Sequence, residues 1–127
     1  MARKRNSLLQ GIDLFRRLSP QLVVSDLIIF LYICENEGIN VSELAQITGI
    51  TEASASRRAR ALAPPDMNGA IPPSVGLVEA FQGGEDGRVR LLFLTAQGRL
   101  FRDQLEDIIA KASPILQFED DERRAAR

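Results

Sequence analysis

The fold of this chain is decided by residues 40–62, which read NVSELAQITGITEASASRRARAL. Asn40 can accept a backbone hydrogen bond at the start of a helix, and Glu43 follows three residues later, as in a capping box. Gly49 can take the left-handed conformation that ends a helix, and Thr51 can cap the next one. The stretch therefore predicts two short helices joined by a sharp turn, which is the helix-turn-helix pattern.

The second of these helices has two different faces. Ala55, Ala59 and Leu62 share one side, which is small enough to pack closely on a neighbouring helix. The opposite side offers hydroxyls and guanidinium groups, which can bond base edges and phosphates. It indicates either a DNA-recognition helix or the solvated face of an ordinary helical hairpin. The candidate DNA-binding residues in this stretch are Thr51, Ala53, Ser54, Ser56, Arg57 and Arg60.

Composition predicts one folding unit without the overall charge of a typical nucleic-acid binder. The 127 residues are 45% hydrophobic, enough for one domain with a core, and the formal net charge is −1. Local clusters matter more than this total, because salt screens fields beyond about 8 Å. Acidic residues concentrate at Glu119 to Glu122. Basic residues gather in three groups: Arg3, Lys4 and Arg5; Arg57, Arg58 and Arg60; and Arg88, Arg90, Arg99 and Arg102.

The residue inventory argues against catalysis. Histidine is absent, which excludes histidine-dependent triads and histidine-containing zinc sites, and no nucleophile-elbow or phosphate-loop motif occurs. The lone cysteine, Cys34, reads as a packed core thiol rather than a redox sensor. No secretory signal or membrane span is visible. We therefore expect a cytoplasmic, nucleoid-associated protein that is not an enzyme and uses no cofactor or metal.

Two helices are predicted before residue 40. A basic arm, residues 1–6, precedes a helix from Ser7 to Leu18 with Leu8, Ile12 and Phe15 on one side. Ser19 and Pro20 form a helix-start signal for a second helix, Gln21 to Glu37, which Gly38 ends. The unbroken apolar run from Leu27 to Cys34 predicts that this second helix is buried nearly all round.

Beyond the helix-turn-helix, residues 63–74 contain two Pro-Pro pairs and Asn-Gly, which predict a loop. It is either a surface connection or a contact to the DNA backbone or a partner subunit. Val75 to Phe81 and Arg88 to Leu94 then read as strands of a hairpin with its tip at residues 82–87. Apolar residues on both faces of the second strand need cover, from the proline-rich loop or from a partner chain.

The C-terminal part, residues 95–118, predicts a dimerisation region followed by a charged tail at residues 119–127. Thr95 caps a helix with an apolar stripe, and more apolar residues follow Ser113-Pro114. Apolar helices at both ends are more than one small core needs, and a homodimer would bury them. The predicted dimerisation residues are Leu8, Ile12, Phe15, Phe101, Leu105, Ile108, Ile109, Ile115 and Leu116.

This order of elements resembles the winged helix-turn-helix transcriptional regulators of the MarR family. The paired helices match at Ile39 to Leu44 and Ile50 to Leu62, and Asp86-Gly87-Arg88 matches the family's wing signature D-x-R. The L-x-L-T-x-x-G signature then matches from Leu92 to Gly98. The resemblance covers about Ser7 to Ala112. It implies a mainly α fold with a small β-hairpin wing, α+β in class, flanked by N- and C-terminal dimerisation helices.

The resemblance implies a regulator, most often a repressor, that binds double-stranded DNA as a homodimer on a pseudo-palindromic operator. Recognition helices would enter successive major grooves, and Arg88 would reach the flanking minor groove while Asp86 steadies the wing. Arg90 is a further candidate DNA-binding residue. Asp86 and Arg88 could otherwise form a simple ion pair on a solvated tip. Family members often respond to small aromatic acids or oxidants, which implies an unidentified small-molecule effector.

The sequence departs from the family pattern in three respects: the loop at residues 63–74 is long, Arg58 occupies a position that is often apolar, and the outer helices are short. The alternative function is a winged-helix module that binds protein and touches DNA weakly or not at all. The sequence pI near 5.5 favours that alternative slightly.

Overall fold

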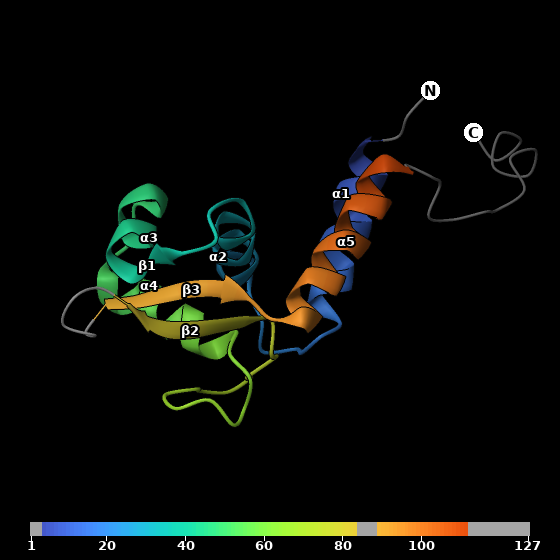
Figure 1. Cartoon of the computed structure of the whole chain (residues 1–127). Helices are drawn as coiled ribbons and strands as arrows, with labels where there is room; N and C mark the ends of the chain where they lie inside the picture. The colour runs from blue at the N-terminus through green and yellow to red at the C-terminus, as the bar shows by residue number, and fades with distance from the viewer. Residues whose placement is uncertain (1–3, 84–88, 112–127) are drawn as a thin grey trace, which may run out of the picture.

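Five helices and a three-stranded sheet make up residues 4–83 and 89–111, the part of the chain that the computed structural model describes (Figure 1). The mainly α fold with a β-hairpin is as predicted. The helices are α1 (Lys4–Arg16), α2 (Val24–Glu35), α3 (Val41–Thr48), α4 (Glu52–Ala61) and α5 (Ala96–Ala110). The strands are β1 (Ile39–Asn40), β2 (Val78–Gly83) and β3 (Val89–Leu94).

The sheet has β3 at its centre, with β1 and β2 paired antiparallel to its two edges. Ile39 pairs with Leu92, and Val78 pairs with Leu94. The sequence pattern gives no sign of β1, because two residues are too few to show alternation. The first hairpin strand begins at Val78 instead of Val75.

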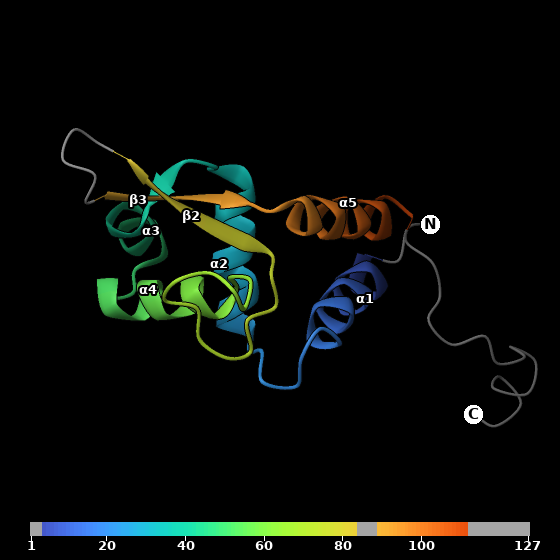
Figure 2. The same ribbon diagram turned by 60° about the horizontal axis from the view of Figure 1, so that its bottom comes forward.

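One face of the sheet packs on the helices and carries the core. Leu92 and Leu94 are buried on this face, together with Phe30, Ile33 and Leu44 from the helices. Figure 2 shows α2, α3 and α4 gathered on this side of the strands. The core thus locks the helix-turn-helix and the hairpin into one body.

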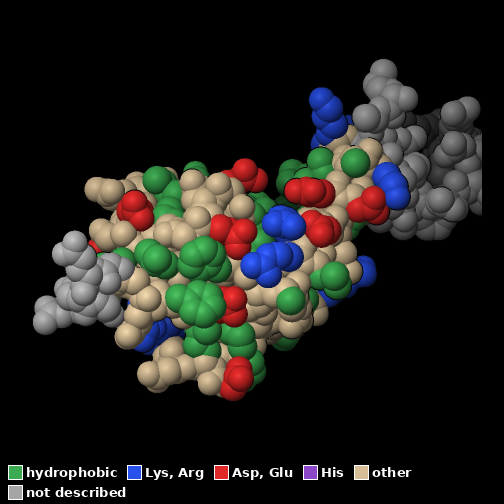
Figure 3. Space-filling view, in the orientation of Figure 1, with side chains coloured by type: hydrophobic (Ala, Val, Ile, Leu, Met, Phe, Trp, Pro, Cys, Tyr) green, Lys and Arg blue, Asp and Glu red, His purple; other side chains and the backbone are tan. Residues whose placement is uncertain are grey.

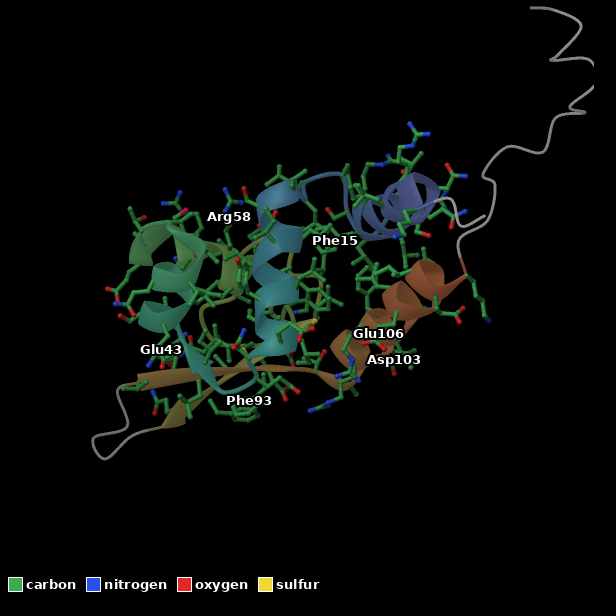
Figure 4. All side chains as sticks on the ribbon, turned by 90° about the horizontal axis from the view of Figure 1, so that it is seen from above. Phe15, Glu43, Arg58, Phe93, Asp103 and Glu106 are labelled. Carbon is green, nitrogen blue, oxygen red and sulfur yellow. The ribbon has the colours of Figure 1, made fainter. Side chains whose placement is uncertain are left out.

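The opposite face of the sheet is only partly covered. Phe81 and Phe93 pack edge to face there, with ring centroids 5.8 Å apart, and Phe81 remains half exposed. Figure 4 shows Phe93 on the side of β3 away from the helices, and Figure 3 shows hydrophobic side chains gathered over β2 and β3. The proline-rich loop does not cover this face, because its residues Met67 and Ala70 lie with Leu92, on the helix side.

Helices α1 and α5 lie side by side and project from the winged body (Figures 1 and 2). Phe15, Phe30 and Phe101 join this pair to the body, with ring centroids 5.6–6.5 Å apart. Each ring comes from a different helix, α1, α2 and α5 respectively. This aromatic cluster anchors α1 and α5 to the winged body.

The bounds of the first two helices differ from the prediction. Helix α1 starts at Lys4, so Lys4 and Arg5 belong to a helix and not to an arm. Helix α2 starts at Val24, and the Ser19-Pro20 signal starts only a turn, in which the Ser19 hydroxyl accepts a bond from the Gln21 N–H at 3.2 Å.

Helix α2 is also less buried than its apolar run suggests. Leu27, Ile29, Phe30 and Ile33 are buried, but the prediction of burial nearly all round is wrong. The exposed apolar residues of this helix are Val24, Ile28, Leu31 and Tyr32. Helix α2 therefore leaves an apolar stripe exposed, and Leu31 in this stripe lies near Leu8 and Ile12 of α1.

Candidate nucleic-acid interface

The helix-turn-helix forms through the predicted local bonds. The Asn40 side chain accepts from the Glu43 N–H at 2.8 Å, and the Glu43 carboxylate accepts from the Asn40 N–H at 3.0 Å. Gly49 has a φ of 74° at the end of α3, which a glycine adopts without strain. The Thr51 hydroxyl accepts from the Ser54 N–H at 3.1 Å and starts α4. Thr51, a predicted DNA-binding residue, is therefore the N-cap of α4.

Helix α4 packs through small residues and leaves its other side free. Ala55, Ala59 and Leu62 are buried as predicted. Ala53 and Arg57 on the opposite side are exposed, and Ser54 and Ser56 are half-buried. The described part of the chain offers Arg57 no ion pair. Helix α4 thus leaves Arg57 and its neighbouring hydroxyl groups on the side away from the core.

Arg58 has a structural role that sequence patterns do not reveal. Its Nη1 lies 3.0 Å from Oδ1 of Asp26, a carboxylate only 4% exposed (Figure 4). The other oxygen of Asp26 accepts the Val23 N–H at 2.9 Å, in the first turn of α2. One buried carboxylate therefore caps α2 and holds α4 against it. The sequence gives two signs of this pair. Asp26 interrupts an apolar helix, and Arg58 occupies a position that is often apolar in the family that the sequence resembles.

Arg60 and Arg90 come together from different elements. The expectation that Arg60 lies free on the outer side of α4 is wrong, because it is half-buried beneath the loop of residues 63–74. It lines a cavity of about 30 Å³ with Arg90 from β3 and with Ser56 and Asn68. The wing residues Asp86 and Arg88 lie outside the described residues.

The loop of residues 63–74 is tied to the end of α4. The Ile71 N–H donates to the Arg60 carbonyl at 3.2 Å, and the Met67 N–H donates to the Pro64 carbonyl at 3.0 Å. The Ser74 hydroxyl donates to the Ile71 carbonyl at 2.7 Å. The prediction of a loop is confirmed, and the bond from Ile71 holds it against the end of α4.

The L-x-L-T-x-x-G residues form the junction between hairpin and α5. Thr95 donates its hydroxyl proton to the Gly76 carbonyl at 2.6 Å and accepts the Gly98 N–H at 2.9 Å, so it caps α5 as predicted. Gly98 lies against the Leu77 carbonyl so closely that a Cβ there would stand 2.0 Å from the oxygen. This signature therefore joins the hairpin to α5 and serves the fold.

The predicted dimerisation residues divide into two groups. Phe15, Phe101 and Leu105 are buried in the chain's own core, whereas Leu8 and Ile109 are 64% and 65% exposed. A groove of about 540 Å³ between α1, α2 and α5 is lined by Leu8, Ile12, Leu27, Leu31, Leu105 and Ile109. Ile108 is half-buried, and Ile115 and Leu116 lie outside the described residues.

Three further features bear on metal binding, membrane insertion and thiol chemistry. In residues 4–83 and 89–111, no cluster of three or more metal-ligating side chains occurs. The same ranges contain no helix with the length and apolarity to cross a bilayer. Burial raises the pKa of the Cys34 thiol from 9.0 to about 11, although nearby Arg102 opposes the shift. A thiol with so high a pKa is a poor nucleophile, in line with its reading as a packed thiol.

Comparison with solved structures shows the same architecture in MarR-family regulators. A MarR regulator from Methanosarcina mazei Go1 matches over 96% of this chain and 83% of its own, with a TM-score of 0.59 and 19% identity. A mutant of E. coli MarR complexed with operator DNA matches over 81% of this chain and 68% of its own, with a TM-score of 0.57 and 20% identity. The repressor CouR, bound to a 23-mer duplex, matches over 96% and 82%, with a TM-score of 0.57 and 22% identity.

No protein-family model and no curated protein sequence matches this chain. The structural matches show the fold, which is the winged helix-turn-helix of MarR-family regulators, as the sequence resemblance predicts.

Proposed function

We propose that this chain is a sequence-specific transcriptional regulator that binds double-stranded DNA, acting as a repressor by occupying an operator. The observation that carries the proposal is the free side of α4, where exposed Arg57 stands with Ser54 and Ser56 on a helix anchored by its alanine side. Arginine can bond guanine with two donors, and serine can bond several bases or a phosphate. Ala53 leaves room for a base to approach.

The hairpin provides a second proposed contact with the DNA duplex. Arg90 on β3 stands beside α4, so the helix and the wing can grip one duplex together. Arg88 of the wing would reach the minor groove while α4 lies in the major groove, as the sequence resemblance implies. Two structural neighbours that are themselves bound to DNA support duplex DNA as the partner.

A homodimer is part of the same proposal. Leu8 and Ile109 flank the apolar groove on the projecting helices, and a second copy would remove them from water. Two-fold symmetry would then present two copies of α4 to half-sites one helical turn apart. A small-molecule effector remains part of the proposed regulation, without a site assigned to it.

Selection of bound duplexes from a random library tests the function, with the oligomer mass measured on the same preparation. We expect an enriched inverted repeat whose half-sites are about 10 base pairs apart, and a mass of two chains. A library that remains unenriched would contradict sequence-specific binding and favour the protein-interaction alternative.

A further inference from the structure

Arg60 and Arg90 meet beneath one residue of the proline-rich loop, Gly69. A Cβ on Gly69 would lie 3.5 Å from Nη1 of Arg90 and 3.6 Å from Cδ of Arg60, so both side chains contact this residue. Gly69 has a φ of 86°, a conformation that other residues adopt only with strain. The loop backbone therefore lies directly on two arginines from distant parts of the sequence.

These two arginines share their cavity with one acidic residue, Glu79 of β2, but neither forms an ion pair with it. Within the described residues, neither makes an ion pair, and Nε of Arg60 is buried with no hydrogen-bond acceptor. Like charges held together repel each other, and a buried N–H without an acceptor is unfavourable. Such an arrangement in a folded protein calls for an ion or water that completes it. An anion would satisfy both requirements.

The loop is positioned to hold the arginines and is not a passive connection. Its Ile71 N–H bonds to the backbone carbonyl of Arg60 itself, and its Ala70 N–H bonds to the Met67 carbonyl at 3.1 Å. These bonds place Gly69 next to the Arg90 guanidinium group and the aliphatic part of the Arg60 side chain. The unusual length of this loop thus has a structural consequence at the nucleic-acid side of the molecule.

The space beside the arginines suits a phosphate group. The cavity of about 30 Å³, lined by Ser56, Asn68, Glu79 and both arginines, has room for at least one oxygen atom. An open groove of about 330 Å³ adjoins it, shares Ser56 and Arg90, and adds Ser42 from the start of α3. One phosphate oxygen can enter the cavity while the remainder of the group lies in the groove.

We propose that Arg60 and Arg90, held by the loop of residues 63–74, form a binding site for a backbone phosphate of DNA. The site lies between α4 and the hairpin, where the phosphate strand that separates a major groove from the adjacent minor groove would pass. The inference rests on the proposed DNA-binding function. It adds that the loop belongs to the interface and that this contact is independent of base sequence.

The test is the salt dependence of duplex binding for the wild-type protein and for R60Q, R90Q, R60K and R99Q. Each lost phosphate contact lowers the slope of log K against log salt by about one. We expect that change for R60Q and R90Q, with an unaltered affinity ratio between selected and scrambled duplexes. R60K keeps its charge and most of the slope. R99Q, an exposed change on α5, leaves the slope as in the wild type.

A second arm distinguishes DNA phosphate from free phosphate. The Nε–Hε resonances of the arginines are followed by NMR during titration with inorganic phosphate alone and then with duplex. Arg60 and Arg90 should shift strongly only with duplex. Saturable shifts at submillimolar phosphate would reassign the site to a small anion and overturn the proposal.

The possible results distinguish a failure of the phosphate site from a failure of the proposed DNA-binding function. Intact wild-type binding with unchanged slopes for R60Q and R90Q would overturn the phosphate site and leave the DNA-binding function standing. A wild-type protein that binds no duplex would overturn the proposed function itself, and the phosphate site with it.

Discussion

Gly98 occupies a position where the chain has no room for a side chain. The Leu77 carbonyl oxygen would stand 2.0 Å from a Cβ, and backbone cannot move aside as a flexible side chain can. We predict that Gly98→Ala lowers the free energy of unfolding by about 3 kcal/mol, because α5 must shift away from the hairpin. Urea unfolding at equilibrium measures this change.

Gly11 provides the matched control, because it is also a helical glycine but has space. A Cβ there would lie 3.5 Å from Cδ2 of Leu105, an ordinary contact. Gly11→Ala should therefore leave stability unchanged or raise it by up to about 1 kcal/mol through better helix propensity. Equal destabilisation by both substitutions would refute the role assigned to Gly98.

Cys34 should be unreactive in the folded chain. Its pKa of about 11 lies above the ordinary value of 9.0 because of burial, so the thiolate fraction at pH 8 is roughly a hundredfold below that of an ordinary thiol. Disulfide exchange with Ellman's reagent should be correspondingly slow and should reach its normal rate in denaturant. A rapid reaction in the folded protein would contradict the packed environment.

The raised pKa of Cys34 also determines how the free energy of unfolding changes with pH. A thiol that is protonated more strongly in the folded chain contributes stability below pH 9, and this contribution falls as the pH rises towards 11. Cys34→Ser should remove this alkaline component from the pH dependence of unfolding.

At the level of elements, one ion pair connects the recognition helix to the core. Helix α4 packs by alanines, which give it little to resist rotation, so the bond from Arg58 to Asp26 fixes its orientation on α2. We predict that Arg58→Met lowers the free energy of unfolding by about 3 kcal/mol, because the buried carboxylate loses its partner. Thermal or urea unfolding provides the measurement.

A double-mutant cycle separates this pair from general effects of either change. Adding Asp26→Asn to Arg58→Met removes the uncompensated charge and should recover part of the loss, since the amide oxygen can still accept the Val23 N–H. Strictly additive effects of the two substitutions would show that the pair does not couple α2 to α4.

Elements defined by local chemistry could be predicted from sequence, and those defined by distant partners could not. The caps at Asn40, Gly49 and Thr51 act within a few residues, so the helix-turn-helix was predictable almost to the residue. The start of α2 depends on Asp26, which caps Val23 from three residues away, and Ser19-Pro20 is a more familiar start signal that drew the prediction upstream. β1 depends on pairing with Leu92, far along the chain, and leaves no local pattern.

The candidate site shows the same division. The buried and free sides of α4 follow from helical periodicity and match the structure at Ala55, Ala59 and Arg57. Periodicity cannot show that the loop after α4 folds back over Arg60, or that Arg58 turns inward to a carboxylate 32 residues away. Long-range packing decides both.

At the scale of the whole molecule, the projecting pair of α1 and α5 is the proposed dimer interface. We predict that Ile109→Glu converts the dimer into a monomer, because the charge would be buried in the apolar groove between copies. Val24→Glu is the control, since Val24 is 62% exposed and lies away from that groove.

Analytical ultracentrifugation gives the mass of each variant. A monomeric wild-type protein, or an unchanged dimer for Ile109→Glu, would place the interface elsewhere. The monomer should also bind its operator less tightly, because one chain reaches only one half-site.

The most direct test of the account is the affinity of wild-type, Arg57→Ala and Arg16→Ala proteins for the selected duplex, by gel-shift titration at fixed salt. Arg57 lies on the free side of α4, whereas Arg16 lies on α1 and pairs with Asp13. We predict that Arg57→Ala loses about 1–3 kcal/mol of binding free energy and part of its discrimination between base sequences, while Arg16→Ala binds as the wild type does. Unchanged affinity of Arg57→Ala would contradict the assignment of α4 as the DNA-recognition helix.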